Sequence, residues 1–270
     1  MCRRLKSGRM EIFMIFDTHA HYDDTQFDED REELLGRMEA GGVGRIVNAA
    51  STIESWDKIR RLTEKYDFMY GSAGVHPDEA GTLDEEAFQR MSDMLEDEKM
   101  VAVGEIGLDY YWDKEGHDLQ KKWFIRQLEL AREKGLPVMI HSRDAAADTM
   151  EIMKNHARGM QGVIHCFSYS PEIAREYVKM GFFIGVGGVV TFKNGRKLKE
   201  TVKEVPLESI VLETDCPYLA PVPFRGKRNS SLYLKYVAEE IAAIKEISCE
   251  EVVRQTERNA EKLYNLPQKN

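Results

Sequence analysis

The sequence predicts a closed (β/α)8 barrel of the TIM-barrel class, with a metal site at the C-terminal ends of its strands. The first observation behind this prediction is that eight short apolar or β-branched runs alternate with longer amphipathic segments. Such alternation indicates parallel βαβ units, and eight units in about 250 residues are typical of a closed barrel. The second observation is that histidines and acids gather at the ends of these runs. A doubly wound open sheet is the alternative, and it is weakened because no G-x-G-x-x-G motif follows the first run.

Eight segments are expected to be strands because they are short, apolar and rich in β-branched residues. They are 12–21, 45–50, 69–77, 100–110, 137–142, 162–168, 182–190 and 209–219. The segments between them are expected to be helical. Residues 117–134 carry apolar side chains near helical spacing, and Gly135 follows as a C-cap. The segment 28–40 has acids in its first turn, where the helix dipole favours them, and helices at 232–246 and 249–264 close the chain.

Composition and charge place the chain among soluble globular proteins and exclude several other classes. Of its 270 residues, 42% are hydrophobic and 31% are charged, and the formal net charge is −9. The acidic balance argues against a surface coated for non-specific nucleic-acid binding, although it allows a local basic site. No apolar run approaches the roughly 20 residues that a membrane helix needs. The four cysteines are scattered without C-x-x-C spacing, which indicates reduced thiols in a cytoplasmic protein.

The sequence shows no linker, low-complexity tract or charge block that would divide the chain into domains. We therefore expect a single barrel domain over residues 12–266. Residues 1–11 are basic, and the apolar stretch that follows them is too short for the h-region of a signal peptide. We expect these residues to be a dispensable extension.

Polar side chains that bind metals lie at the C-terminal ends of six predicted strands, where barrels of this class carry their active sites. Five of the seven histidines are among them. The set consists of His19, His21, His76, Glu105, His141, His165 and Asp215. Taken singly, His141 is compatible with a hydrogen-bonded core histidine and Asp215 with a turn aspartate. Glu105 is harder to explain in that way, because a carboxylate in an apolar strand is costly to bury unless a cation pairs with it.

Four histidines and two carboxylates are more ligands than one zinc ion uses, so the set favours two metal ions. The first and last strands of a closed barrel are neighbours, so Asp215 and the two histidines of the first strand can share one ion. The fifth and sixth strands are also neighbours, so His141 and His165 can share the other. Glu105, on the fourth strand, can bridge the two. A pair of divalent ions can activate a water molecule and stabilise the attacking and leaving oxygens.

Seven motifs in order resemble those of the TatD family of metal-dependent hydrolases, which are often described as deoxyribonucleases. The motifs are FDTHAH, GVHPDEA, VGEIGLDYY, PVMIHSRDA, GVIHCFSYS, LETDCPYLAP and PFRGKRN, and the resemblance extends over residues 15–265. It implies a barrel of the amidohydrolase type, a divalent-metal site and phosphodiester hydrolysis. It also implies metal ligation by His19, His21, Glu105, His141, His165 and Asp215. His76 matches a further motif position and is expected to lie near the site, in reach of the substrate.

An anionic substrate needs positive charge beyond the metals. Arg225, Lys227 and Arg228 follow the last strand, and Arg143 follows His141, so all four are candidates for phosphate contact. For Arg143, an ion pair with Asp144 or Asp109 is an equal alternative. Four aromatic residues near the same rim are candidates either for stacking on bases or for packing: Tyr110, Tyr111, Trp112 and Phe167.

One departure from the family pattern follows the basic motif. Ser230 and Ser231 stand where the family usually has Glu-Pro. Because proline restricts the residue before it, the change is expected to alter the rigidity of the loop and the fit of substrate. Neither position is a predicted metal ligand.

Together with the two-metal ligand set, the resemblance implies a hydrolase that uses two divalent ions and cleaves DNA at strand ends or in single strands, in the manner of an exonuclease. Asp215 is the expected proton acceptor and Glu105 the expected bridge between the ions. Zinc or manganese suits the histidine-rich set, and magnesium is the common ion of nucleases. The alternative is a D-aminoacyl-tRNA deacylase or another amidohydrolase-type hydrolase of esters or amides, and a barrel that only binds is a third. No membrane or obligate protein partner is expected.

Overall fold

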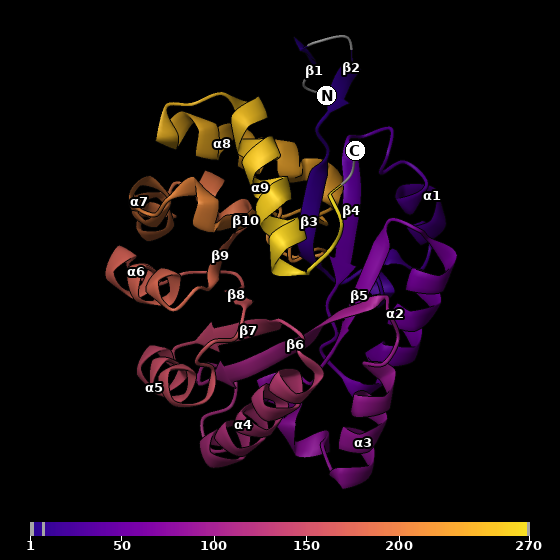
Figure 1. Cartoon of the computed structure of the whole chain (residues 1–270), viewed down its shortest axis with the longest axis vertical. Helices are drawn as coiled ribbons and strands as arrows, with labels where there is room; N and C mark the ends of the chain where they lie inside the picture. The colour runs from indigo at the N-terminus through magenta and orange to yellow at the C-terminus, as the bar shows by residue number, and fades with distance from the viewer. Residues whose placement is uncertain (1–2, 7–8, 269–270) are drawn as a thin grey trace.

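Eight parallel strands form one sheet that curls into a nearly closed barrel, as the sequence predicts (Figure 1). The computed structural model describes residues 3–6 and 9–268. The strands of the barrel are β3 Ile15–Ala20, β4 Val43–Asn48, β5 Met69–Ala73, β6 Met100–Asp109, β7 Val138–Arg143, β8 Gly162–Ile164, β9 Phe183–Val186 and β10 Ile210–Leu212. From β3 to β10, each strand pairs in parallel with the next one along the chain.

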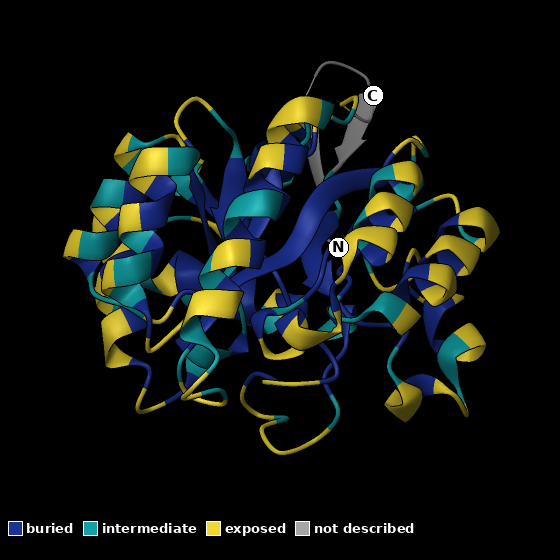
Figure 2. Ribbon diagram, turned by 90° about the horizontal axis from the view of Figure 1, so that it is seen from below, coloured by how far each residue is buried: buried dark blue, intermediate teal, exposed yellow. Residues whose placement is uncertain are grey.

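Helices cover the outside of the barrel, so that their outward faces are exposed while the strands are buried (Figure 2). They are α1 Arg31–Leu35, α2 Ile53–Lys65, α3 Glu85–Met94, α4 His117–Lys134, α5 Ala146–His156, α6 Pro171–Lys179, α7 Arg196–Glu204, α8 Leu234–Lys245 and α9 Cys249–Leu263. The end of α4 is the predicted one, because Gly135 caps it with a left-handed φ of 67°. In the described parts of the chain, no helix is both long and apolar enough to cross a bilayer.

Two kinds of boundary differ from the prediction. The segment 28–40 contains only the five-residue helix α1, followed by turns. Gly36, Gly41 and Gly42 lie in or beside these turns, and glycine has a low helix propensity. The strands β8 and β10 are shorter than predicted, so the residues expected at their ends lie in the loops just beyond them.

The barrel has a seam between β10 and β3. Within the described residues, an isolated bridge between Ala20 and Cys216 is the only sheet pairing across it. Side chains complete the junction. The buried carboxylate of Asp17 accepts hydrogen bonds from the Thr214 backbone N–H at 3.0 Å, the Thr214 hydroxyl at 2.7 Å and the Ser231 hydroxyl at 2.6 Å. The closure of the barrel therefore depends on a polar cluster as well as on a β-ladder.

The helix α9 lies across β3 and β10 and closes the N-terminal mouth of the barrel (Figure 1). The side chains of Leu263 and Tyr264 pack into a buried cluster with apolar residues contributed by seven strands. The Tyr264 hydroxyl donates a hydrogen bond to the Thr18 carbonyl at 2.7 Å, and the Arg45 guanidinium pairs with Glu261 at 2.9 Å. With one mouth filled in this way, the opposite mouth remains for a site.

A small antiparallel hairpin precedes the barrel and belongs to a separate sheet. It consists of β1 Arg3–Lys6 and β2 Arg9–Ile12. Ile12, which we expected in the first barrel strand, therefore ends the hairpin, and the barrel begins at Ile15. That residues 1–11 are dispensable stays a prediction.

Candidate metal centre

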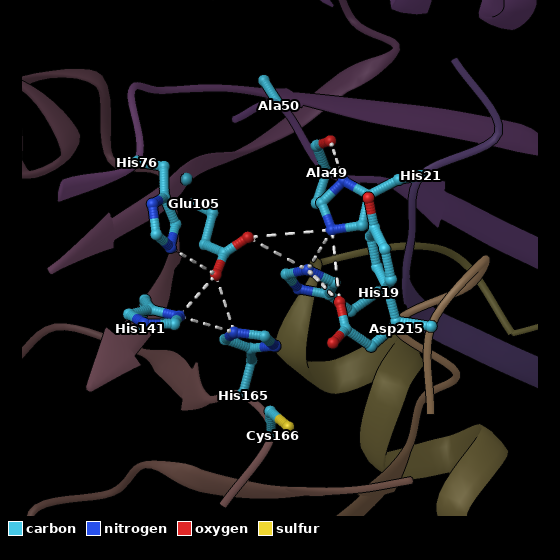
Figure 3. Close-up of polar contacts among 12 residues, drawn as sticks. His19, His21, Ala49, Ala50, His76, Glu105, His141, His165, Cys166 and Asp215 are labelled. Atoms are coloured by element: carbon cyan, nitrogen blue, oxygen red, sulfur yellow. Dashed lines mark hydrogen bonds and ion pairs between the residues drawn. The ribbon is translucent and has the colours of Figure 1, made fainter. Parts of the chain in front are cut away.

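Six histidine and carboxylate side chains meet at the C-terminal mouth of the barrel, although they come from five separate segments of the chain (Figure 3). They are His19 and His21 from β3 and its end, Glu105 from β6, His141 from β7, His165 from the loop after β8, and Asp215 from the loop after β10. Their clustering is the one that the sequence predicts. His76, in the loop after β5, lies beside them.

The first group of donor atoms spans the seam. The Nε2 atoms of His19 and His21 are 3.1 Å apart. Glu105 Oε2 lies 3.3 Å from His19 Nε2, and Asp215 Oδ1 lies 3.3 Å from His21 Nε2. The other ring nitrogen of His21, Nδ1, is 3.0 Å from the Ala49 carbonyl oxygen. An Nδ1–H that donates to this carbonyl leaves the Nε2 lone pair facing the group.

The second group uses the other oxygen of the same carboxylate. Glu105 Oε1 lies 2.8 Å from His141 Nδ1 and 2.7 Å from His165 Nε2, and these two nitrogens are 3.2 Å apart. His76 Nε2 is 3.6 Å from the same oxygen. Figure 3 shows Glu105 between the two groups, with one oxygen directed to each.

The spacing of the donor atoms fits divalent cations. Two nitrogens bound at 2.0–2.1 Å to one ion lie about 2.8–3.4 Å apart, the shorter value at octahedral and the longer at tetrahedral angles. The nitrogen pairs in the two groups are separated by 3.1 Å and 3.2 Å. Two imidazole lone pairs at this distance repel each other unless a proton or a metal ion lies between them. Imidazole and carboxylate are also the ligands that zinc and related divalent ions prefer.

The electrostatics of the centre favour bound positive charge. Burial alone would raise the pKa of Glu105, but the histidines around it, His165 first, hold that pKa well below its usual range. Burial alone would lower the pKa of His21, but hydrogen bonding to Asp215 and the nearby carboxylates raise it to about 10. Burial and the neighbouring His165 lower the pKa of His19 to about 4. A cation that binds here displaces the protons that the histidines hold.

The sequence indicates Asp109 only as a possible partner of Arg143, whereas the structure places it against the predicted ligand His141. Its buried carboxylate has Oδ2 3.0 Å from His141 Nε2, the ring nitrogen that points away from Glu105. Asp109 is four residues after Glu105, so the period of two places both on one face of β6. The strands β6 and β7 approach each other closely here. A Cβ at Gly107, whose φ is 148°, would lie only 1.9 Å from the His141 carbonyl oxygen, so glycine is required at this position.

We expect Asp109→Asn to weaken the binding of divalent cations by about 10- to 100-fold, because the carboxylate orients the His141 ring and increases its basicity. Competition with a chromophoric chelator measures the affinity. Asp57→Asn, an exposed change on α2, is the matched control. Equal affinities for the Asp109 variant and the unaltered protein would contradict the role assigned to this carboxylate.

Glu213 is a second buried acid that the sequence analysis did not single out. Its Oε1 accepts a hydrogen bond from the Cys166 backbone N–H at 2.5 Å, directly beside His165. Its carboxylate packs against Gly185, where a Cβ would come within 2.3 Å of Oε2. Burial raises the pKa of Glu213 to about 8. Glu213 belongs to the LETD motif, but nothing in this motif indicates that Asp215 is the predicted metal ligand and Glu213 a buried acid beside it.

The predicted phosphate-binding cations fall into two groups. Arg228 forms a two-pronged ion pair with Asp30, at 2.8 Å and 2.5 Å, and donates to the Gln26 carbonyl. Arg143, Arg225 and Lys227 are exposed and form no ion pair within the described residues. Arg225 and Lys227 line a pocket of about 450 Å³ together with Tyr218.

The four aromatic residues of the rim divide equally between packing and exposure. Phe167 is buried, and Tyr110 stacks on His117 at 3.6 Å and donates its hydroxyl to Asp148. Tyr111 and Trp112 are exposed to 46% and 65%. These two rings are therefore the ones that a ligand can reach.

Ser231 is part of the seam and not of an open loop. Its side chain is fully buried, donates to Asp17 at 2.6 Å and lies 2.8 Å from the Tyr22 hydroxyl. Ser230 caps the short helix that follows by accepting a hydrogen bond from the Leu232 backbone N–H. The departure from the Glu-Pro pattern thus supplies one hydroxyl group, that of Ser231, to the junction of β3 and β10.

Comparison with known proteins finds relatives that are described as metal-dependent hydrolases. The family described as TatD related DNase matches residues 16–265. An uncharacterized metal-dependent hydrolase of Bacillus subtilis, YabD, is 46% identical over 94% of this chain and 100% of its own length. YcfH of Escherichia coli, described in the same words, is 35% identical over 94% of this chain and 97% of its own.

A solved structure is similar over nearly the whole barrel. The TatD homologue YjjV of Escherichia coli superposes with a TM-score of 0.89 at 32% identity, covering 95% of this chain and 100% of that one. The range that the family model matches, residues 16–265, begins in β3, ends just after α9 and contains every residue of the centre. The chain therefore belongs to the TatD family of metal-dependent hydrolases.

Proposed function

We propose that this protein hydrolyses phosphodiester bonds of DNA at strand ends or in single strands. One observation carries the proposal: two groups of donor atoms share the carboxylate of Glu105, and unpaired cationic side chains lie on the same rim. The matching family is described as TatD related DNase, which supports a nucleic-acid substrate.

The two carboxylates of the centre differ in exposure, and this difference suggests separate roles. The Glu105 side chain is 5% exposed and lies between the two donor groups, so we assign it to bridging two ions. The Asp215 side chain is 19% exposed and lies at the open side. Burial alone would raise the pKa of Asp215, but hydrogen bonding to His21 lowers it, so the carboxylate is ionised and can accept a proton from an attacking water.

Two divalent cations, zinc, manganese or magnesium, would be held by His19, His21 and Asp215 on one side and by His141 and His165 on the other. Bound there, they supply Lewis-acid chemistry, polarising a phosphoryl oxygen and lowering the pKa of water. His76 faces Glu105 from the rim and is placed to contact the substrate.

The charge around the centre favours a strand end over a long duplex. The protein has a net charge of −9, so a duplex that extends over its surface would be repelled. Arg143, at the end of β7, and Arg225 and Lys227, in the chain after β10, offer a few local phosphate contacts. Arg228 is a weaker candidate, because its guanidinium is already held by Asp30.

The test is a cleavage assay on DNA that is labelled at the 5′ or the 3′ end, as single strands and as duplexes, with each of the three metals. We expect stepwise shortening of single strands, and a loss of at least about 100-fold in Asp215→Asn. D-aminoacyl-tRNA is the comparison substrate. If the loaded protein leaves all the DNA intact with every metal, or hydrolyses the aminoacyl ester much faster, the nuclease proposal is wrong.

A further inference from the structure

Two exposed aromatic side chains stand on the rim of the metal centre without a structural partner that explains their exposure. Trp112 is 65% exposed and Tyr111 is 46% exposed, and their rings meet edge to face at 4.8 Å. The other two tryptophans, Trp56 and Trp123, are exposed to only 2% and 4%. Trp112 thus leaves most of its apolar area in water, which costs free energy unless a ligand covers it.

The loop that carries these rings is fixed to the metal centre by one carboxylate. Asp109 Oδ1 accepts hydrogen bonds from the backbone N–H groups of Tyr111 at 2.8 Å and Trp112 at 2.9 Å. Its other oxygen, Oδ2, is 3.0 Å from His141 Nε2. The position of the aromatic pair is therefore set relative to a predicted metal ligand, through a group that is itself buried.

An unpaired cation completes the surface. The Arg143 guanidinium lies 3.9 Å from the centre of the Tyr111 ring and 5.5 Å from that of Trp112. It forms no ion pair with Asp144 or Asp109 within the described residues, so the alternative to phosphate contact does not hold. Arg143 is two residues beyond His141 on β7, a separation of about 6–7 Å along a strand.

These features fit an unpaired nucleobase better than a protein partner or a duplex. A nucleotide presents a flat π-face and a phosphate a few ångströms apart, and the rim presents a ring face and a cation at a similar spacing. A base inside a duplex is already stacked on both faces and cannot use the ring. A protein partner would bury the rings without needing them beside the metal ligands.

We propose that Trp112 is a stacking platform for an unpaired base next to the scissile phosphate, and that Tyr111 holds Arg143 in place to contact a phosphate of the same strand. This inference rests on the proposed function and specifies the substrate: a strand with an unpaired end. Trp112 and Arg143 are binding residues in this scheme and take no part in bond cleavage.

The experiment is a binding titration of the full-length protein, metal-loaded and after chelation. The ligand is a short oligothymidylate with phosphorothioate linkages that resist hydrolysis. Saturable quenching of tryptophan fluorescence is expected, because Trp112 is the exposed tryptophan. In anisotropy measurements with a labelled strand, Trp112→Ala should weaken binding by roughly 5- to 150-fold, and Trp112→Phe should retain most of it.

Two controls separate stacking from other causes. Leu119→Ala removes an exposed apolar side chain, 40% exposed on α4, and should leave binding unchanged. An abasic strand of equal length keeps the phosphates and should cause little quenching. Equal binding by Trp112→Ala and the unaltered protein, or equal quenching by the abasic strand, would overturn the stacking site. If the protein cleaves DNA but Trp112→Ala binds the strand as well as the unaltered protein does, only the stacking platform is refuted. If the strand quenches the fluorescence but no DNA is cleaved, only the nuclease proposal is refuted.

Discussion

Replacing Glu105 by glutamine is expected to lower hydrolysis by about three orders of magnitude and to remove bound metal. The carboxylate lies between both donor groups, with Oε2 3.3 Å from His19 Nε2 and Oε1 2.7 Å from His165 Nε2. An amide keeps the shape but loses the charge, and its NH2 group points hydrogens where a cation would sit. Loss of a shared metal ligand removes several kcal/mol of transition-state stabilisation, and about 4 kcal/mol corresponds to roughly 10³ in rate.

The measurement combines kcat/KM on the labelled DNA with elemental analysis of bound metal. Glu86→Gln, an exposed change on α3, is the matched control. Circular dichroism shows whether the Glu105→Gln protein is folded, so loss of metal is separated from loss of structure. Full metal content and near-normal rates in Glu105→Gln would contradict the central position that we assign to this residue.

Replacing Asp17 by alanine is expected to destabilise the protein by about 3–4 kcal/mol, because it removes the acceptor at the centre of the seam. The Thr214 backbone N–H and the Thr214 and Ser231 hydroxyls all donate to this carboxylate at 3.0 Å or less. All three groups are buried and have little access to water. Each donor left without a partner costs about 1–3 kcal/mol, and the hydroxyls recover part of this by rotating.

Thermal unfolding in the presence of a chelator measures the effect without a contribution from bound metal. For a chain of this size, the loss lowers the midpoint by roughly 5–7 °C. Asp17→Asn keeps one acceptor oxygen and should lose less, and Asp57→Ala on the exposed face of α2 should lose almost nothing. A midpoint for Asp17→Ala that equals that of the unaltered protein would show that the seam does not depend on this carboxylate.

Much of the fold could be predicted because the pattern in the sequence is local. Eight apolar runs became the eight barrel strands, and the helix over 117–134 has the predicted bounds because Gly135 provides a clear end signal. The segment 28–40 was predicted less well. The acids of its first turn indicated a helix, but Gly36, Gly41 and Gly42 favour turns, and the helix ends at Leu35. Local propensities compete there, and tertiary contacts decide between them.

The candidate centre could be predicted in part, for a different reason. Parallel strands in a barrel bring all their C-terminal ends together, so the convergence of His19, Glu105 and Asp215 follows from topology alone. The roles of the two buried acids that contact the predicted ligands and their loops, Asp109 and Glu213, do not follow from the topology. Asp109 and Glu213 are acids in strand or loop positions like many others, and their roles depend on contacts between segments 32 or more residues apart. Only the packed structure shows which side chain each of them faces.

The seam gives the proposed metal site a consequence for the whole chain. His21 and Asp215 lie on opposite sides of it, so a cation held between them ties the first strand of the barrel to the last. Such a tie closes a loop of nearly 200 residues, since Thr214 and His19 are 195 positions apart, and the unfolded chain cannot keep it. We therefore expect a cation bound at this position to stabilise the closed barrel, and its removal to weaken the contact between β3 and β10 first.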